Sequence, residues 1–195
     1  MKTFYIIVIA FVSCVLANPT VDTIRTSRTP EPPVIDGKLT EAVWDNADVV
    51  ESFLQSQPDE GKPASEKTLV HILYDEKALY VGARMYDSAP DSIIGRLCRR
   101  DVQVPSDLFA VFIDPYHDKR TGVYFGVNPA GTLYDGTLSN DDWMDDSWDA
   151  VWETATHVDS LGWCAEMRIP FSQLRFKPTE TFEWGINFRR DINRK

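Results

Sequence analysis

The central part of the sequence alternates short apolar runs with turn residues. Leu108–Asp114 is an unbroken apolar run that ends in an aspartate, which is typical of a strand buried on both faces. Val123–Asn128 follows a polar connection that contains a proline, so the two runs predict a β-hairpin. The turn Asn128–Gly131 then leads into a third short run, Thr132–Thr137. This succession predicts a β-meander at the centre of the fold.

The flanking sequence continues the same pattern and adds almost no helix. Helical spacing is confined to Leu39–Ala47 and to one turn after Pro170. Further strands are expected at Lys67–Tyr74, Ala78–Tyr86, Ala150–Val158, Trp163–Ile169 and Phe182–Ile192. About ten short strands with regular turns favour an all-β fold, an antiparallel β-sandwich of the immunoglobulin-like or jelly-roll-like kind with one or two short helices.

The charge of the chain limits its partners. The 195 residues suit one domain, and 30 acidic against 20 basic residues give a net charge of −10. Nucleic acids and anionic lipid surfaces bind proteins that carry clustered basic residues. Because this chain is strongly acidic, neither is an expected partner. A neutral ligand, a cation or no ligand fits this charge better, and we expect a monomer.

The N-terminus has the pattern of a signal peptide over residues 1–17. Lys2 is followed by the apolar stretch Thr3–Leu16, and Ala17 ends a small-residue cleavage site. This stretch is shorter than the ~20 residues that span a bilayer. The mature chain is therefore expected to begin with a polar lead-in, residues 18–32, and to act in the periplasm, at the cell surface or as a secreted protein.

Cleavage would leave two cysteines, Cys98 and Cys164. An exported protein can form a disulfide, but spacing along a sequence carries no geometry. A disulfide between them and a pair of buried thiols are both open.

A loop that combines carboxylates with indoles is the best site candidate. Its acidic residues offer the oxygen ligands that calcium prefers, although their spacing differs from that of an EF-hand loop. The candidate metal ligands are Asp141, Asp142, Asp145, Asp146 and Asp149. The alternative is a solvated acidic loop without a metal.

Aromatic side chains in and after this loop can stack on a sugar ring, whose apolar face suits an exposed indole. The candidate ligand-binding residues are Asn140, Trp143, Trp148 and Trp152. The alternative for Trp148 and Trp152 is packing into the sandwich, which we expect for Trp152 in particular. We expect Trp143 to be the side chain that stacks on a sugar ring.

Motifs for catalysis are missing from the sequence. Neither a nucleophile elbow, a phosphate-binding glycine loop nor a zinc-protease helix is present. Carboxylates are numerous, but a glycosidase needs two of them at a defined separation. We expect no catalysis by this chain, which at most serves as an accessory domain of a glycoside hydrolase.

Several pieces, taken in order, resemble carbohydrate-binding family 9 domains. These pieces are Val34–Trp44, Val70–Asp75, Ala78–Gly82, Asp107–Asp114 and Gly162–Phe171. The resemblance implies that residues 33–195 form a sandwich of two antiparallel sheets that binds sugar without catalysis and often carries calcium. Phe176 and Trp184–Asp191 are similar to the closing strand of a bacterial group in which such a domain precedes an outer-membrane-type β-barrel.

The residues that bind sugar in this family do not carry over. The first aromatic clamp position falls in Gln103–Pro105, the acidic strand residue is replaced by Ala110, and the arginine on the next strand is replaced by Gly126. The second clamp tryptophan has no equivalent before Lys195, so we expect a domain cut short at its C-terminus. A sugar site in this chain would need other residues.

The function expected from these patterns is that of an exported, non-catalytic carbohydrate-binding module associated with the breakdown or uptake of a polysaccharide such as xylan or glucan. One alternative is a structural N-terminal domain of an outer-membrane barrel protein without sugar affinity. Another is a haem-binding sandwich that uses residues such as Met85 and His71.

Overall fold

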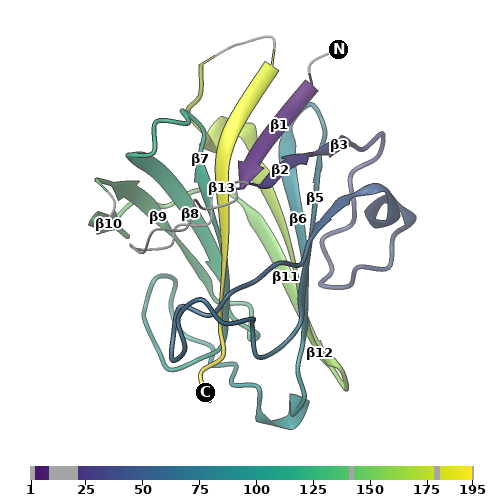
Figure 1. The fold of residues 1–195 in the computed structure, drawn as a ribbon, viewed down its shortest axis with the longest axis vertical. Helices are drawn as coiled ribbons and strands as arrows, with labels where there is room; N and C mark the ends of the chain where they lie inside the picture. Colours follow the sequence, from purple (N-terminus) through teal and green to yellow (C-terminus); the bar gives the residue numbers. More distant parts are fainter. Residues whose placement is uncertain (1–2, 9–21, 141–142, 178–180, 195) are drawn as a thin grey trace.

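The computed structural model describes residues 3–8, 22–140, 143–177 and 181–194. These residues form strands and three short 3-10 helices, in two layers that are visible in Figure 1. The strands are β1 (Thr3–Val8), β2 (Asp22–Arg25), β3 (Ser27–Arg28), β4 (Asp48–Val50), β5 (Thr68–Tyr74), β6 (Ala78–Tyr86), β7 (Leu108–Asp114), β8 (Thr121–Val127), β9 (Leu133–Ser139), β10 (Trp143–Asp145), β11 (Glu153–Asp159), β12 (Gly162–Pro170) and β13 (Thr181–Asp191). The 3-10 helices are η1 (Ala42–Asn46), η2 (Pro90–Ser92) and η3 (Phe171–Gln173).

One sheet has the order β10-β9-β8-β7-β13-β1-β2, and the other has the order β11-β12-β6-β5-β3 with β4 also paired to β5. Neighbouring strands are antiparallel except for the pairs β1–β13 and β3–β5. The predicted all-β antiparallel sandwich is confirmed. Sequence reasoning missed β10, which lies inside the segment predicted as a loop.

The core lies between the facing sheets and follows the alternation of the strands. On β12, Trp163, Ala165, Met167 and Ile169 are buried together, as the sequence predicts. The facing sheet contributes residues with the same period, among them Val111 of β7. Since successive side chains of a strand point to opposite faces, the same alternation leaves the intervening residues for the outer surfaces.

The outer face of the second sheet carries a smaller apolar cluster around Trp44. Trp44 therefore plugs this outer face and does not cover the central core. A Cβ on Gly82 would lie 2.5 Å from Leu39 Cδ2 and 3.1 Å from the Trp44 ring, so the missing side chain makes room for the indole. The predicted helix over Leu39–Ala47 is only the 3-10 turn η1, which is enough to lay Trp44 on the sheet.

A buried carboxylate binds the segment that contains Asp36, Gly37 and Trp44 to the outer face of the second sheet. Glu166, fully buried on β12, accepts hydrogen bonds from Asp36 N (2.9 Å), Gly37 N (2.7 Å) and Trp44 Nε1 (3.1 Å). Burial raises the pKa of Glu166 to about 7, against the lowering effect of these donors, and the charge of Glu41 raises it further.

We expect Glu166 to make stability depend on pH. The folded pKa lies above the unfolded value of 4.5, so this stabilisation is complete below about pH 4.5 and is lost as pH rises through about 7. Chemical denaturation from pH 5 to pH 8 should show wild type losing up to about 2 kcal/mol relative to Glu166→Gln, which cannot ionise. A difference between the two proteins that stays constant over this range would contradict the expectation.

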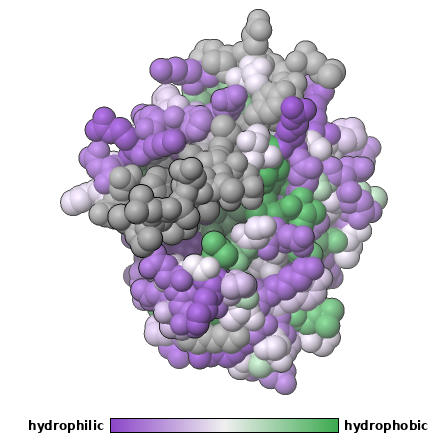
Figure 2. All heavy atoms as spheres, in the orientation of Figure 1, coloured by the Kyte–Doolittle hydropathy of each residue, from purple (hydrophilic) through white to green (hydrophobic). Residues whose placement is uncertain are grey.

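The surface and the N-terminal strand complete the fold. Among the coloured residues of Figure 2, hydrophilic ones predominate, and hydrophobic ones lie mainly toward the right of the face. The predicted signal peptide includes β1, which pairs with β13 and β2, so cleavage after Ala17 would remove a strand from the first sheet. Within the described ranges, no helix is long and apolar enough to cross a membrane.

Candidate functional site

The exposed indole of Trp143 marks the free edge of the first sheet. It belongs to β10, the end strand of that sheet, at the left of Figure 1. Its side chain is 70% exposed, the most of any tryptophan that the structure describes. An edge strand has no neighbour on one side, so a ligand can approach the ring from solvent.

Polar side chains accompany Trp143 along the sheet. Trp143 pairs with Ser139 of β9, which pairs in turn with Thr121 of β8. Asn140 donates its backbone N–H to Arg120 O at 2.8 Å, and Arg120 Nη2 donates to Asn140 Oδ1 at 3.4 Å. We call Trp143 with these four residues the Trp143 platform, since it combines an exposed ring with hydroxyl, amide and guanidinium groups.

The other two candidate indoles pack on the core, as expected for Trp152 in particular, so Trp148 is corrected from a ligand-binding to a packing residue. Trp152 is only 7% exposed, and its ring meets Phe125 edge-on at 5.3 Å between centroids. Trp148 is half-buried and meets the same Phe125 ring at 6.1 Å. Both pack on the core, where the chain passes from β10 of the first sheet to β11 of the second.

Those carboxylates of the loop that the structure describes have different partners and do not gather around one centre. Asp145 accepts hydrogen bonds from Ser147 Oγ (2.6 Å) and Ser147 N (3.0 Å). Asp146 accepts a hydrogen bond from Tyr124 Oη at 2.5 Å. Asp141 and Asp142 lie outside the described residues. The described carboxylates of the loop therefore do not fit the predicted set of ligands for one calcium ion.

Asp149 belongs to a different acidic cluster, with Asp101 and Asp135, whose carboxylate oxygens lie within 4.8 Å of one another. Arg100 lies among them: its Nε is 2.7 Å from Asp135 Oδ1 and 3.2 Å from Asp149 Oδ1. Three carboxylates suit calcium chemically, but the guanidinium already supplies the positive charge that they need. We therefore assign no metal to this cluster.

Two residues that sequence reasoning missed hold the segment after Trp143. Tyr124, on the outward side of β8, binds Asp146 as described above. Gly136 of β9 leaves space for the neighbouring backbone, since a Cβ there would lie 2.6 Å from Asp145 O and 2.7 Å from Tyr124 Cε1. The alternation of β8 could indicate that Tyr124 faces outward, but nothing in the sequence indicated its partner.

The two strand positions that the family resemblance assigns to sugar binding are apolar in this chain. Ala110 and Gly126 are cross-strand partners on β7 and β8, and both are buried. Neither position offers a polar group to a sugar.

The sequence left open whether the two cysteines form a disulfide, and the structure favours free thiols. Cys98 and Cys164 are free thiols: Cys98 Sγ lies 3.4 Å from Tyr134 Oη on the first sheet, and Cys164 Sγ accepts from Arg84 Nη1 at 3.1 Å on the second.

The two residues named for the haem alternative do not lie together. Met85 is fully buried in the central core, whereas His71 lies in edge-on contact with Trp44 on the outer face of the same sheet. Residues on opposite faces of one sheet cannot ligate a single iron.

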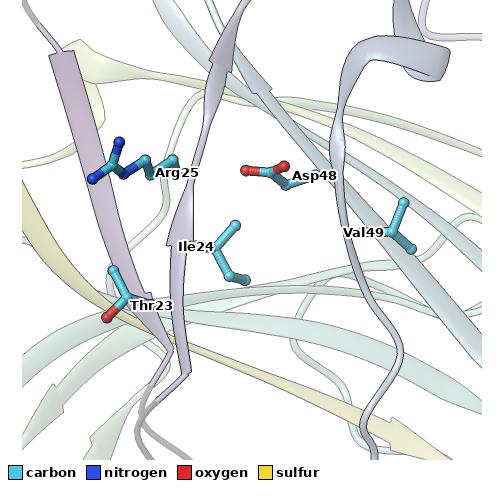
Figure 3. A pocket seen from close by; sticks show the side chains of 5 residues that line it. All are labelled: Thr23, Ile24, Arg25, Asp48 and Val49. Carbon is cyan, nitrogen blue, oxygen red and sulfur yellow. The ribbon is translucent and has the colours of Figure 1, made fainter.

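A surface pocket of about 410 Å³ lies between β2 and β4, as Figure 3 shows. Thr23, Ile24, Arg25, Asp48 and Val49 line it, and none of them is aromatic. The pocket is therefore less suited to stacking a sugar ring than Trp143, which lies at the other end of the sheet.

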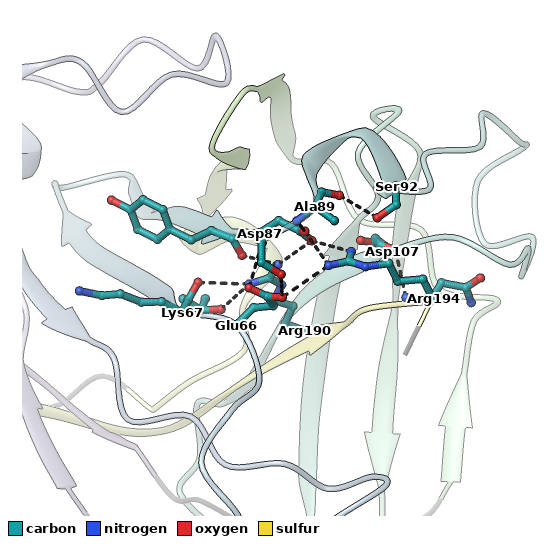
Figure 4. A network of polar contacts seen from close by, with 12 residues as sticks. Glu66, Lys67, Asp87, Ala89, Ser92, Asp107, Arg190 and Arg194 are labelled. Atoms are coloured by element: carbon teal, nitrogen blue, oxygen red, sulfur yellow. Dashed lines mark hydrogen bonds and ion pairs between the residues drawn. The ribbon is translucent and has the colours of Figure 1, made fainter.

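A buried ionic network joins the two sheets near the C-terminal end of β13 (Figure 4). Arg194 donates to both carboxylate oxygens of Asp87, at 2.6 and 2.7 Å. Arg190 donates to the carbonyl of Tyr86 at 2.8 Å and to Thr68 Oγ1 at 3.1 Å. The bonds of Arg190 run from β13 of the first sheet to β5 and β6 of the second, so the network connects the two sheets.

The fold and the platform define a class of protein: a two-sheet antiparallel sandwich that presents an aromatic ring and polar groups at a sheet edge. A model of the carbohydrate family 9 binding domain-like family matches residues 35–193. The chain belongs to this family.

Solved structures share the fold at low sequence identity. A family 9 carbohydrate-binding module from Caldicellulosiruptor kristjanssonii in complex with cellotriose gives a TM-score of 0.61 at 21% identity, covering 86% of this chain and 75% of that chain. A module of the same family and organism in complex with glucose gives 0.59 at 20% identity, covering 85% and 76%. A search of curated proteins finds no match.

Proposed function

We propose that this chain is an exported, non-catalytic carbohydrate-binding module that holds a neutral oligosaccharide or polysaccharide on the Trp143 platform. The observation that carries the proposal is the 70% exposed indole of Trp143 on an edge strand, in a chain of a carbohydrate-binding family. Proteins fold with most large aromatic rings covered, so an exposed one beside polar groups favours a ligand.

The platform suits the two kinds of surface on a sugar. The indole can stack on the apolar face of a pyranose ring, and Ser139, Thr121, Asn140 and Arg120 supply donors and acceptors for its hydroxyls. Ala110 and Gly126 stand at positions that bind sugar in the family that the chain resembles, but neither has a polar side chain. In this chain the hydrogen bonds to sugar hydroxyls would therefore come from the Trp143 platform.

The net charge of the chain and its family membership favour a neutral polysaccharide as the ligand. The net charge of −10 disfavours acidic polysaccharides. Neutral β-glucans and xylans remain, and the related modules were solved with cellotriose and with glucose. We therefore propose a role in the breakdown or uptake of such polysaccharides.

A glycan array probed with the purified chain tests the sugar-binding function. We expect retention on neutral glucan or xylan oligosaccharides and none on acidic ones. Array signals with calcium and with a chelator should agree, because the described loop carboxylates have protein partners. Absence of binding to every glycan would contradict the proposed function.

Export is tested separately by N-terminal sequencing of the protein from its producing cells. Cleavage of the predicted signal peptide gives a chain that begins at Asn18. A chain that keeps residues 1–17 would contradict export by this route and would retain β1 in the first sheet.

A further inference from the structure

The short strand that carries Trp143 has little to stabilise it by itself. β10 is three residues long and lies at the sheet edge, and all its side chains are exposed. Apolar burial therefore contributes little to its position, and such a segment opens at low cost in free energy. Something beyond its pairing with β9 must hold the indole still if a sugar is to stack on it.

The structure supplies this support directly after β10. Tyr124 is 4% exposed, its ring packs against Phe112 at 5.9 Å between centroids, and its hydroxyl reaches Asp146. The anchor is thus rigid, while Asp146 belongs to the exposed loop that it holds. Burial and then the bond to Asp146 raise the pKa of Tyr124, so the phenol stays protonated and remains a donor at neutral pH.

Gly136 adds a second constraint on the same stretch. The absence of a Cβ lets Asp145 O lie directly over β9, next to the Tyr124 ring. The end of β10 is thereby held between a backbone contact and a hydrogen bond on consecutive residues, Asp145 and Asp146.

We infer that Tyr124 is the positioning residue of the Trp143 platform: its hydroxyl holds β10 through Asp146, so the chain's own groups fix the indole without a metal ion. This inference rests on the proposed sugar-binding function of Trp143 and adds how the site is kept in place. It differs from the calcium hypothesis, which needs the carboxylates of Asp145 and Asp146 for a cation.

The experiment measures cellotriose affinity by calorimetry and backbone amide exchange of residues 143–147 for four variants. Tyr124→Phe and Asp146→Ala both break the hydrogen bond, and we expect about tenfold weaker cellotriose binding and about tenfold faster exchange in this segment. Asp146→Asn keeps an acceptor for the phenol and should restore both properties to near the wild-type values.

Tyr134→Phe is the matched control. Tyr134 is also 4% exposed, on the neighbouring strand β9, but its hydroxyl contacts Cys98 and not the loop. This variant should leave affinity and exchange unchanged, whereas a general effect of losing a buried hydroxyl would appear in both tyrosine variants.

The outcomes separate the two proposals. If wild type does not bind cellotriose but Tyr124→Phe speeds exchange, the positioning role stands and cellotriose is not the sugar. If wild type binds cellotriose and Tyr124→Phe changes neither affinity nor exchange, the inference is wrong. A chelator that weakens wild-type binding and speeds exchange in the same segment would also overturn it, in favour of a metal.

Discussion

Replacement of Trp152 by alanine is expected to lower the free energy of unfolding by about 3–5 kcal/mol, the usual cost of deleting a buried large aromatic side chain. The indole fills the space beside Phe125 at the end of the sandwich and is almost fully covered. Removing it leaves a cavity that rigid strands on both sides can close only in part. Urea denaturation followed by circular dichroism measures the loss.

A conservative variant refines this test. Trp152 Nε1 is buried without a hydrogen-bond partner among the described residues, so Trp152→Phe loses no polar contact there. We expect it to cost about 1–2 kcal/mol, well below the alanine variant. Equal losses for the two variants would show that the packing argument is wrong.

Replacement of Arg190 by methionine should destabilise the domain by a similar amount, about 3–5 kcal/mol. The guanidinium extends from β13 to the ends of β5 and β6, so its loss leaves the Tyr86 carbonyl and Thr68 hydroxyl without this donor. It also removes a positive charge that lies 3.7 Å from buried Asp87. Methionine keeps most of the side-chain volume, which makes the polar contacts the main variable.

Arg189→Met is the control for charge alone. Arg189 is the adjacent residue, points to the opposite face and pairs with Asp191 from a side chain that is 59% exposed. A surface ion pair of this kind contributes about 0–1 kcal/mol. Denaturation curves for the two variants should therefore separate clearly, and coinciding curves would contradict the connecting role of Arg190.

Much of the scaffold could be predicted from the sequence because burial imposes a period of two on each strand. Trp163, Met167 and Ile169 alternate in the sequence and lie together in the core. The same rule could not find β10, which is only three residues long, too short to show an alternation, and forms by pairing with β9.

The candidate site could be predicted only in part, because the partners of polar side chains depend on the three-dimensional fold. The sequence indicated that Trp143 was an accessible ring, and its exposure agrees. It grouped the loop carboxylates by proximity in the chain, but Asp146 bonds to Tyr124, 22 residues away, and Asp149 pairs with Arg100. Spacing along the chain contains no information on such contacts.

The central claim is that the exposed ring of Trp143 binds sugar and contributes little to the fold. Calorimetric titration of wild type and Trp143→Ala with cellotriose, beside their melting curves, tests it most directly. The account predicts at least about tenfold weaker binding for the variant, which corresponds to about 1.4 kcal/mol, and stability within about 0.5 kcal/mol of wild type. Undiminished cellotriose affinity in Trp143→Ala, or unfolding of the variant, would contradict it.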